Sequence, residues 1–398
     1  MATAPFLDCL CKLLTDDQSV YTDILVKENE GIRYLAPVGW VDLGVEIDME
    51  EVIDFCLELS QLKTKEKLYE AVASEGALNI SCTIQGQRAR VDISLSTTNP
   101  TSQIVDDSTP IIQVGRSSLE LTIRKGSVIP SLTDLEFPPS FIKALTKRSG
   151  LILITGQAGS GKTTTSAAIL RHINETMQSH IICIGDPIEF FIENESSVFS
   201  YKELGKDAPS FELAVYNAYR QRADVICISE LRDRETTKQA LSVSYSALVI
   251  ATIHSPTAEE GLERIINFFP SEEQMIYRTL QSSINFVVSQ ALLPTIDNQN
   301  FKMAFELISG TNEVLQSSLR AGKGFSSLRT VMHELTDIAL KGQPRPADRE
   351  KDFRGLLPMN VALVKSVLAK KVSAEHARRV SPDQKQFDNF VYPKQVKN

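Results

Sequence analysis

The sequence predicts an α/β protein in three parts: a small N-terminal α+β domain, a larger domain built on a mostly parallel sheet, and a helical C-terminal region. Two observations support this prediction. Short apolar strands alternate with helical segments between residues 148 and 310, as expected for a parallel sheet covered on both faces. The 398 residues, 42% hydrophobic and 23% charged, are enough for two or three globular domains.

The N-terminal domain is expected over residues 1–129. Alternating apolar and polar residues predict short strands, and one segment has helical periodicity. The predicted strands are residues 23–26, 32–36, 79–84 and 88–95, and the predicted helix covers residues 50–59. Pro130 and the run Phe137-Pro138-Pro139 then indicate a linker over residues 130–147.

The second domain is expected over residues 148–310, and residues 311–398 are expected to form the helical, increasingly basic C-terminal region. Four apolar runs predict buried strands: residues 151–155, 181–184, 225–229 and 248–253. The carboxyl ends of parallel strands lie at one edge of the sheet, which is where ligands bind. Residues that directly follow these runs are therefore candidates for a functional site.

The first of these strands leads into a phosphate-binding loop. Gly156-Gln157-Ala158-Gly159-Ser160-Gly161-Lys162-Thr163 matches the pattern G-x-x-x-x-G-K-[ST] in full, and a helix is predicted from Thr163 to Ile173. The backbone N–H groups would surround the β-phosphate of a nucleotide, and Lys162 would reach the β- and γ-phosphate oxygens. We predict that Gly156 to Thr164 bind the nucleotide and that Thr163 binds Mg²⁺.

Carboxylates follow the second and third strands. Asp186 and Glu189 are predicted to order Mg²⁺ and water beside the phosphates, although Asp186-Pro187 alone is also typical of a turn. Glu230 ends the third strand in the Walker B arrangement, where a carboxylate polarises the water that attacks the γ-phosphate. Glu230 is the predicted general base, and Glu189 is a further catalytic candidate.

His254 ends the fourth strand at the same sheet edge, where its imidazole would sense the γ-phosphate. A lone histidine at a strand end is more often structural. Arg220, Arg232 and Arg234 flank the site. An arginine that neutralises charge in the transition state contributes about 10³ to 10⁵ in rate, whereas surface arginines usually contribute little.

The bulk composition excludes some function classes. The net charge of −8 gives no overall footprint for nucleic acid, so direct sequence-specific nucleic-acid binding is not expected. The six cysteines are scattered, as is typical of free thiols in a reducing compartment. Because no apolar run reaches 18 residues and no signal peptide is found, a soluble cytoplasmic protein is expected, at most peripheral to a membrane.

Taken together, the motifs resemble those of the pilus retraction ATPases and their relatives in the type II/IV secretion superfamily. The resemblance covers roughly residues 20–335 and has four boxes in order: Walker A, Asp box, Walker B and His box. It rests on the runs 156–165, 186–190, 203–207, 220–221, 230–233, 252–254 and 269–270.

The resemblance implies a hexameric ring of two-domain subunits, each with a RecA-like P-loop domain that binds ATP and Mg²⁺ between the domains. It also implies that arginines of the N-terminal domain complete the neighbouring subunit's site, and the matching positions are Arg88, Arg90 and Arg124. These arginines are equally typical of ordinary charges on a sheet surface. The implied partners are inner-membrane platform proteins of a secretion or pilus machine, which would hold the ring at the inner membrane.

Three departures from the family pattern decide between its branches. Gly185 replaces the Glu that usually opens the Asp box, Ser229 replaces the Gly before the Walker B Glu, and residues 312–318 replace the Ala-Ile-Arg-Asn-Leu-Ile stretch associated with retraction. These departures predict slower turnover and favour an ATPase that powers type IV secretion or conjugation. A pilus retraction ATPase is the first alternative, and a nucleotide-binding assembly scaffold with little turnover is the second.

Overall fold

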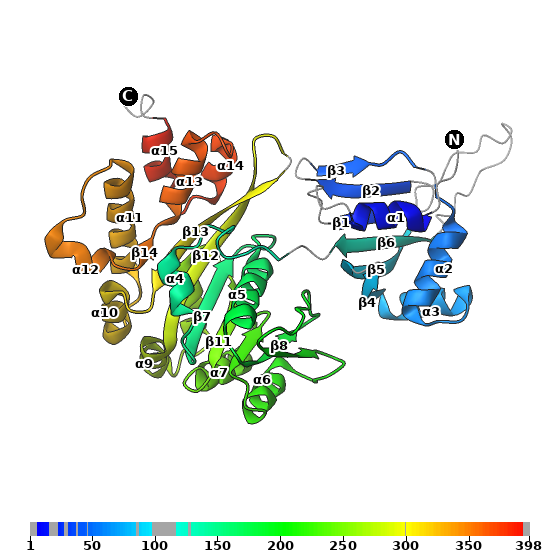
Figure 1. Ribbon diagram of the computed structural model, residues 1–398, viewed down its shortest axis with the longest axis horizontal. Coiled ribbons are helices and arrows are strands. Elements are labelled where there is room, and N and C mark those ends of the chain that lie inside the picture. The colour runs from blue at the N-terminus through cyan, green and yellow to red at the C-terminus, as the bar shows by residue number, and fades with distance from the viewer. Residues whose placement is uncertain are drawn as a thin grey trace. The chain divides into compact units, whose positions relative to one another are not determined.

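The chain divides into two compact units (Figure 1). The structure, a computed structural model, describes residues 6–15, 23–27, 31–36, 39–45, 47–84, 87–97, 117–125, 129–298 and 300–392. The first unit comprises residues 1–127 with 298–300, and the second comprises residues 128–297 with 301–398.

The first unit is an antiparallel sheet with helices on one face. Its strands in the described ranges are β1 (Asp23–Lys27), β2 (Gly31–Ala36), β3 (Gly39–Asp42), β4 (Ala77–Ile84), β5 (Gln87–Thr97) and β6 (Ser117–Lys125). Its helices there are α1 (Phe6–Thr15), α2 (Met49–Ser60) and α3 (Lys65–Glu75). The strand order is β3-β2-β1-β6-β5-β4, and all neighbours are antiparallel.

Alternation along the strands builds the core of this unit. Val91 and Ile93 of β5 lie opposite Ile123 and Leu121 of β6, and all four are buried because alternate residues of a strand point to one face. Helix α1 covers this face with residues at helical spacing: Phe6, Leu10 and Leu14. The predicted α+β class is confirmed, whereas α1, α3, β3 and β6 lie where no element was predicted.

The second unit is built on a mostly parallel sheet. Its strands in the described ranges are β7 (Gly150–Gly156), β8 (His180–Gly185), β9 (Val198–Glu203), β10 (Val225–Ile228), β11 (Leu248–His254), β12 (Ile284–Pro294), β13 (Phe301–Ser309) and β14 (Leu356–Leu357). The order is β14-β13-β12-β7-β11-β10-β8-β9, and only the β12–β13 and β13–β14 pairs among these strands are antiparallel. The four strands predicted here are present as β7, β8, β10 and β11.

Helices cover both faces of this sheet. They are α4 (Pro139–Ala144), α5 (Lys162–Thr176), α6 (Phe211–Arg220), α7 (Arg234–Val243), α8 (Ala258–Asn267) and α9 (Glu273–Ser283). Helices α4 and α5 pack on one face through Phe141, Ile169 and Ile173. On the other face α6 to α9 pack through an apolar layer that includes Val215 and Leu262.

The segment 130–147, expected to be a linker, is part of this second core. Leu132, Phe137, Phe141 and Leu145 are buried against the α5 face of the sheet. Phe137 stacks on Phe141 and on Phe305 at ring-centroid distances of 4.6 Å. The two prolines after Phe137 therefore introduce helix α4 instead of marking an unpacked connection.

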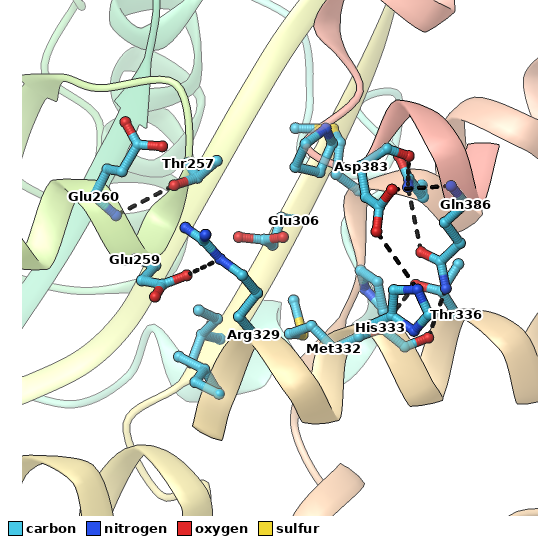
Figure 2. A pocket seen from close by; sticks show the side chains of 16 residues that line it. Thr257, Glu259, Glu260, Glu306, Arg329, Met332, His333, Thr336, Asp383 and Gln386 are labelled. Atoms are coloured by element: carbon cyan, nitrogen blue, oxygen red, sulfur yellow. Dashed lines mark hydrogen bonds and ion pairs between the residues drawn. The ribbon is translucent and has the colours of Figure 1, made fainter. Parts of the chain in front are cut away.

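Over the described residues 311–392, the C-terminal region is mainly helical and includes the short strand β14. Its helices are α10 (Glu313–Ala321), α11 (Ser326–Leu340), the 3₁₀ helix η1 (Ala347–Arg349), α12 (Glu350–Phe353), α13 (Met359–Leu368), α14 (Ala374–Val380) and α15 (Gln384–Val391). A cavity of about 330 Å³ is lined by α8, β13, α11 and the start of α13 (Figure 2). Within the described ranges, every helix is too short or too polar to span a bilayer.

Candidate active site

The phosphate-binding loop connects β7 to α5, as predicted. Gly156 has φ +152° and Gly161 has φ +84°, a backbone region that favours glycine. A Cβ atom at Gly156 would lie 2.3 Å from Ser160 Oγ and 2.6 Å from the Gln290 carbonyl oxygen. The first and last glycines of the motif are therefore required by geometry as well as by the approach of a phosphate.

Gln290 of β12 supports this loop from the neighbouring strand. Its Nε2 donates to the Ser160 carbonyl oxygen at 2.7 Å, and both side chains are buried. Among the described residues, Ser160 Oγ and Gln290 Oε1 have no hydrogen-bond partner. Buried polar atoms normally have partners, and the Ser160 hydroxyl can donate to a phosphate oxygen, whereas Gln290 Oε1 can only accept from a donor. Gln290 was not predicted as a site residue from the sequence. A polar residue inside an apolar strand is the signal that could have indicated it.

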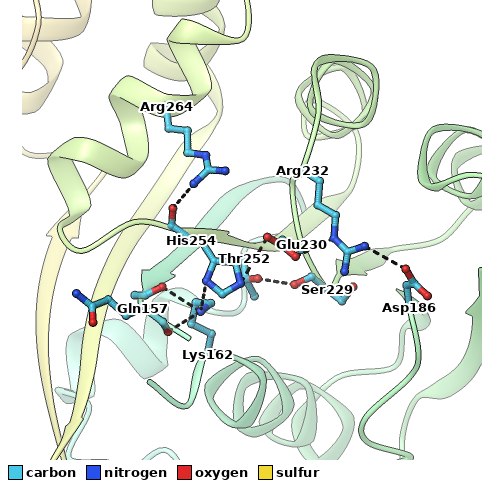
Figure 3. Close-up of polar contacts among 10 residues, drawn as sticks. Gln157, Lys162, Asp186, Ser229, Glu230, Arg232, Thr252, His254 and Arg264 are labelled. Atoms are coloured by element: carbon cyan, nitrogen blue, oxygen red, sulfur yellow. Dashed lines mark hydrogen bonds and ion pairs between the residues drawn. The ribbon is translucent and has the colours of Figure 1, made fainter. Parts of the chain in front are cut away.

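Lys162 opens helix α5 and is 8% exposed. Its Nζ donates to the carbonyl oxygens of Gly156 at 3.0 Å and Gln157 at 2.9 Å, and lies 3.2 Å from His254 Nδ1 (Figure 3). Burial lowers the pKa of Lys162, and the charges of Glu230 and Glu189 oppose this effect. The Walker lysine is therefore already within reach of both the loop and the predicted catalytic carboxylates.

His254 bridges Lys162 and Glu230. It pairs with Gly156 across β7 and β11, which explains why the His box meets the phosphate-binding loop. Because an ammonium group can only donate, His254 Nδ1 accepts from Lys162 and the ring proton lies on Nε2. That nitrogen is 3.5 Å from Glu230 Oε1. The predicted Walker A lysine, His box histidine and Walker B glutamate thus form one polar chain.

Arg232 continues this chain on the other side of Glu230. Its Nε donates to Glu230 Oε2 at 2.8 Å and its Nη1 to Asp186 Oδ2 at 3.0 Å (Figure 3). The guanidinium also lies over the Phe211 ring, 5.6 Å from the centroid. The hydrogen bond to Glu230 raises the pKa of Arg232. Arg232 therefore fixes the orientation of Glu230, a role that the sequence analysis had not specified.

The other flanking arginines have different contacts. Arg234 pairs with Glu272 and lies over the Phe269 ring at 5.2 Å, whereas Arg220 lies over the Tyr216 ring at 5.9 Å. Among the described residues, neither arginine contacts the polar chain from Lys162 to Asp186, so Arg232 is the flanking arginine that lies in the site.

The predicted metal ligands are not brought together as a cluster. Asp186 is exposed and paired with Arg232, and Glu189 is exposed but close enough for its charge to act on Lys162. Thr163 and Thr164 are half-buried in the first turn of α5. The described residues contain no group of three His, Cys, Asp or Glu side chains that could hold a metal. Mg²⁺ in a nucleotide site needs only one or two protein oxygens besides phosphates and water, and the Thr163 hydroxyl and the carboxylates of Asp186 and Glu189 are oxygen donors of that kind.

Gly185 lies at the end of β8, opposite Glu203 of β9. A Cβ atom at Gly185 would lie 2.9 Å from Ile188 Cδ1 and 2.9 Å from the Pro187 carbonyl oxygen. A larger residue would therefore require Ile188 to move. Gly185, which replaces the usual Glu of the family, therefore fits the close packing of the loop that follows it.

The three predicted N-terminal arginines lie in the first unit. Arg90 of β5 and Arg124 of β6 are directly opposite each other, and Arg88 pairs with Thr83 across β4 and β5. Arg124 is exposed, and its Nε donates to Asp23 Oδ1 at 2.8 Å. Arg90 and Arg124 flank the buried Val91 and Ile123 in sequence, so they belong to the opposite face of the sheet from the core.

Comparisons with known proteins identify the family and the fold. Residues 79–343, more than half of the chain, match the family described as Type II/IV secretion system protein. The type IV pilus ATPase PilU of Pseudomonas aeruginosa is 38% identical over 186 residues, which are 46% of this chain and 48% of that protein. The chain spans about half the length of the curated relatives it matches first.

Two solved structures share the fold over nearly the whole chain. The pilus retraction motor PilT with bound ADP has a TM-score of 0.72 and 25% identity, and the match covers 96% of this chain and 98% of that one. The ATPase DotB of Legionella pneumophila has a TM-score of 0.70 at 21% identity and covers 94% of each chain. The likeness to PilT confirms the predicted architecture, and the likeness to DotB concerns the fold alone.

Proposed function

This chain belongs to the type II/IV secretion system protein family, and we propose that it is an ATP-hydrolysing motor subunit that drives retraction of a type IV pilus. The observation that carries the proposal is the polar chain from Lys162 through His254 to Glu230, which joins the Walker A, His and Walker B boxes in one site. A scaffold that only bound nucleotide would need Lys162 but not a water-activating carboxylate beside it.

The choice of machine follows from the comparisons. The sequence alone favours an ATPase of secretion or conjugation, with a pilus retraction ATPase as the alternative. Two relatives that are 38% identical are named as a type IV pilus ATPase and a twitching motility protein, whereas the 21% identity to DotB supports a shared fold alone. The comparisons thus favour the retraction alternative. If the chain is a retraction ATPase, it still departs from the family pattern at Gly185, Ser229 and residues 312–318.

ATP binding begins at the loop. Backbone N–H groups of residues 156–163 surround the phosphates, and Lys162 exchanges its contacts with the Gly156 and Gln157 carbonyl oxygens for phosphate oxygens. Thr163 and Glu189 would hold Mg²⁺, and the ion would supply neutralising charge at the phosphates. Asp186, paired with Arg232, orders the loop beside them.

Hydrolysis depends on Glu230. Its carboxylate, held by Arg232, orients and polarises the attacking water, which adds to the γ-phosphorus as the bond to the β-phosphate oxygen breaks. His254 lies between Glu230 and Lys162, so capture of Lys162 by the γ-phosphate changes its contact with the imidazole. His254 thereby reports the presence or loss of the γ-phosphate to the rest of the subunit.

The subunits act as a hexameric ring at the cytoplasmic side of the inner membrane, bound to platform proteins of the pilus machine. In the ring, Arg88, Arg90 and Arg124 of one subunit complete the site of its neighbour. An arginine supplied in trans neutralises charge that develops in the transition state. In a head-to-tail ring every site then has one Walker loop from one subunit and one arginine set from the next.

Mixing two inactive variants tests this sharing. One variant carries Lys162→Ala, and the other carries Arg88→Ala, Arg90→Ala and Arg124→Ala. Equal mixing with subunit exchange should restore roughly a quarter of the sites, because a restored site needs one specified variant on each side of an interface. Phosphate release before and after mixing measures the recovery. Mixed rings that stay inactive would show that these arginines do not act across subunits.

Deleting the gene tests the choice of machine. We expect pili to form but not retract, so twitching is lost while transfer of secreted or conjugated substrates continues. A wild-type copy should restore twitching, and a copy with Glu230→Gln should not. Normal retraction together with loss of substrate transfer would reverse the choice in favour of secretion.

A further inference from the structure

Glu306 is a buried carboxyl group outside the nucleotide site. It lies in β13 opposite Ser289 of β12 and is 9% exposed. Burial raises the pKa of Glu306 to about 7, so both of its protonation states are populated at neutral pH. The backbone N–H group of Ala258 donates to Glu306 Oε1 at 3.4 Å, and the backbone N–H group of Met359 lies close enough to the carboxyl group to lower its pKa.

These two donors are the first residues of two helices. Ala258 begins α8 and Met359 begins α13. The N–H groups of a first helical turn have no partner inside the helix, and Pro358 supplies no side-chain cap to α13. The carboxylate accepts from the first residue of α8, and its negative charge lies at two positive helix ends. Glu306 therefore joins α8 to α13.

Helix α8 leads directly from the His254 segment. Arg264 of α8 donates from Nη1 to the His254 carbonyl oxygen at 2.6 Å. Ser289, the cross-strand neighbour of Glu306, donates from Oγ to the Pro256 carbonyl oxygen at 3.2 Å. A shift of the first turn of α8 would therefore move the backbone that carries the His254 imidazole.

Helix α13 is tied to the last two helices. Asn360 Nδ2 donates to the Asp383 carbonyl oxygen at 3.0 Å, and Ser381 Oγ donates to Asn360 Oδ1 at 2.8 Å. Residues 380–382 and Met359 in turn line a cavity of about 300 Å³ together with residues 157–160 of the phosphate-binding loop. The C-terminal helices therefore border the phosphate-binding loop across this cavity, which leaves space for these helices to shift.

The second cavity, of about 330 Å³, lies around Glu306 (Figure 2). The other titratable groups that line it are Glu259 and Glu260 of α8, Arg329 and His333 of α11, and Asp383 before α15. Arg329 pairs with Glu259 at 2.8 Å, and His333 lies 3.4 Å from Asp383. Because these groups are paired with one another, the carboxyl group of Glu306 is left facing the first residues of α8 and α13.

We infer that Glu306 is a positioning residue for ATP hydrolysis: it holds the His254 segment and helices α13–α15 in one arrangement, an inference that rests on the proposed function. Its ionised form accepts both N–H groups with two oxygens, whereas the neutral acid has less acceptor capacity. Release of α8 displaces His254 relative to Lys162 and Glu230. A misplacement of about 1 Å at a catalytic centre costs on the order of 100-fold in rate.

Steady-state ATP hydrolysis of the full chain tests this role. Glu306→Ala should lower kcat about tenfold or more, with a much smaller change in KM. Glu306→Gln should lower kcat less than Glu306→Ala, to about the value of the wild-type chain below pH 7, because its amide oxygen, like the carbonyl oxygen of the neutral acid, still accepts one backbone N–H group. It should also lose the rise in kcat that the wild-type chain shows as Glu306 ionises near pH 7.

Two control variants accompany these measurements. Glu273→Gln changes an exposed carboxylate of α9 and should behave as wild type. His333→Gln replaces the histidine that lines the same cavity and should keep the wild-type pH profile. A folded Glu306→Ala variant with wild-type kcat, or a Glu306→Gln variant with the wild-type pH profile, would overturn the inference. If Glu306→Ala does not fold, the pH profile of Glu306→Gln decides alone.

If the proposed function is wrong, the experiments give a result that differs from the one expected if only the role of Glu306 is wrong. A wild-type chain that hydrolyses no ATP contradicts the proposed function, and amide hydrogen exchange then tests the joint at Glu306 directly. Exchange at Ala258 and Met359 should be faster in folded Glu306→Ala than in wild type, because both N–H groups lose their acceptor. Unchanged exchange at both residues would overturn the inference.

Discussion

Replacement of Glu230 with Gln is expected to lower kcat for ATP hydrolysis by about 10² to 10⁴, the usual contribution of a group that activates a nucleophile. The amide cannot take a proton from water or hold negative charge beside it. ATP affinity should change little, since Lys162 and the loop N–H groups are untouched. Phosphate release at saturating ATP measures kcat, and titration with a fluorescent ATP analogue measures Kd.

The geometry around Glu230 makes this variant a clean test. The Gln amide oxygen can still accept from Arg232 Nε, which donates to Glu230 Oε2 at 2.8 Å in the wild-type chain, so the local fold should persist. Glu212→Gln, in an exposed position of α6, is the matched control and should hydrolyse ATP at the wild-type rate. An unchanged rate in Glu230→Gln would exclude Glu230 as the activating group. No hydrolysis in the wild-type chain would instead favour the scaffold alternative.

The parts of the site that could be predicted are those encoded by neighbouring residues. The phosphate-binding loop needs a strand, glycines at set positions and a helix start, and residues 150–176 supply these in sequence. Glu230 and His254 could be placed because each directly follows or ends a buried strand. Parallel strands bring such positions to one sheet edge whatever their loops do.

The contacts that complete the site come from residues distant in sequence. Arg232 was one of three flanking arginines, and nothing local distinguished it from Arg220 or Arg234. It reaches Asp186 because β8 and β10 are neighbours in the sheet. Gln290 supports Ser160 because β12 pairs with β7, a pairing that sequence periodicity does not reveal.

The C-terminal region shows the same limit. Its helical character followed from composition and periodicity, but the capping of α8 and α13 by Glu306 depends on how β13 lies between them. The available signal was a charged residue inside the apolar strand 304–308. Such a residue is expected to have a specific partner when buried, although sequence alone does not identify that partner.

Replacement of Lys162 with Ala is expected to weaken ATP binding by about 100-fold or more, because charge-assisted hydrogen bonds to the phosphates are lost. Hydrolysis should fall below detection at ATP concentrations that saturate the wild-type chain. Titration with a fluorescent ATP analogue measures the change in Kd. This outcome differs from that of Glu230→Gln, in which binding is kept and turnover is lost.

Folding controls make the Lys162 result interpretable. Because burial lowers the pKa of Lys162, the folded state holds this proton less tightly than the unfolded state, so removing the ammonium should not lower Tm near neutral pH. Lys162→Met, which keeps the apolar stem, should bind ATP as weakly as Lys162→Ala with a wild-type Tm. Lys238→Ala, in an exposed position of α7, should bind normally. Tight ATP binding by folded Lys162→Ala and Lys162→Met would mean that the nucleotide is held elsewhere, and the assignment of residues 156–164 as its site would have to be abandoned.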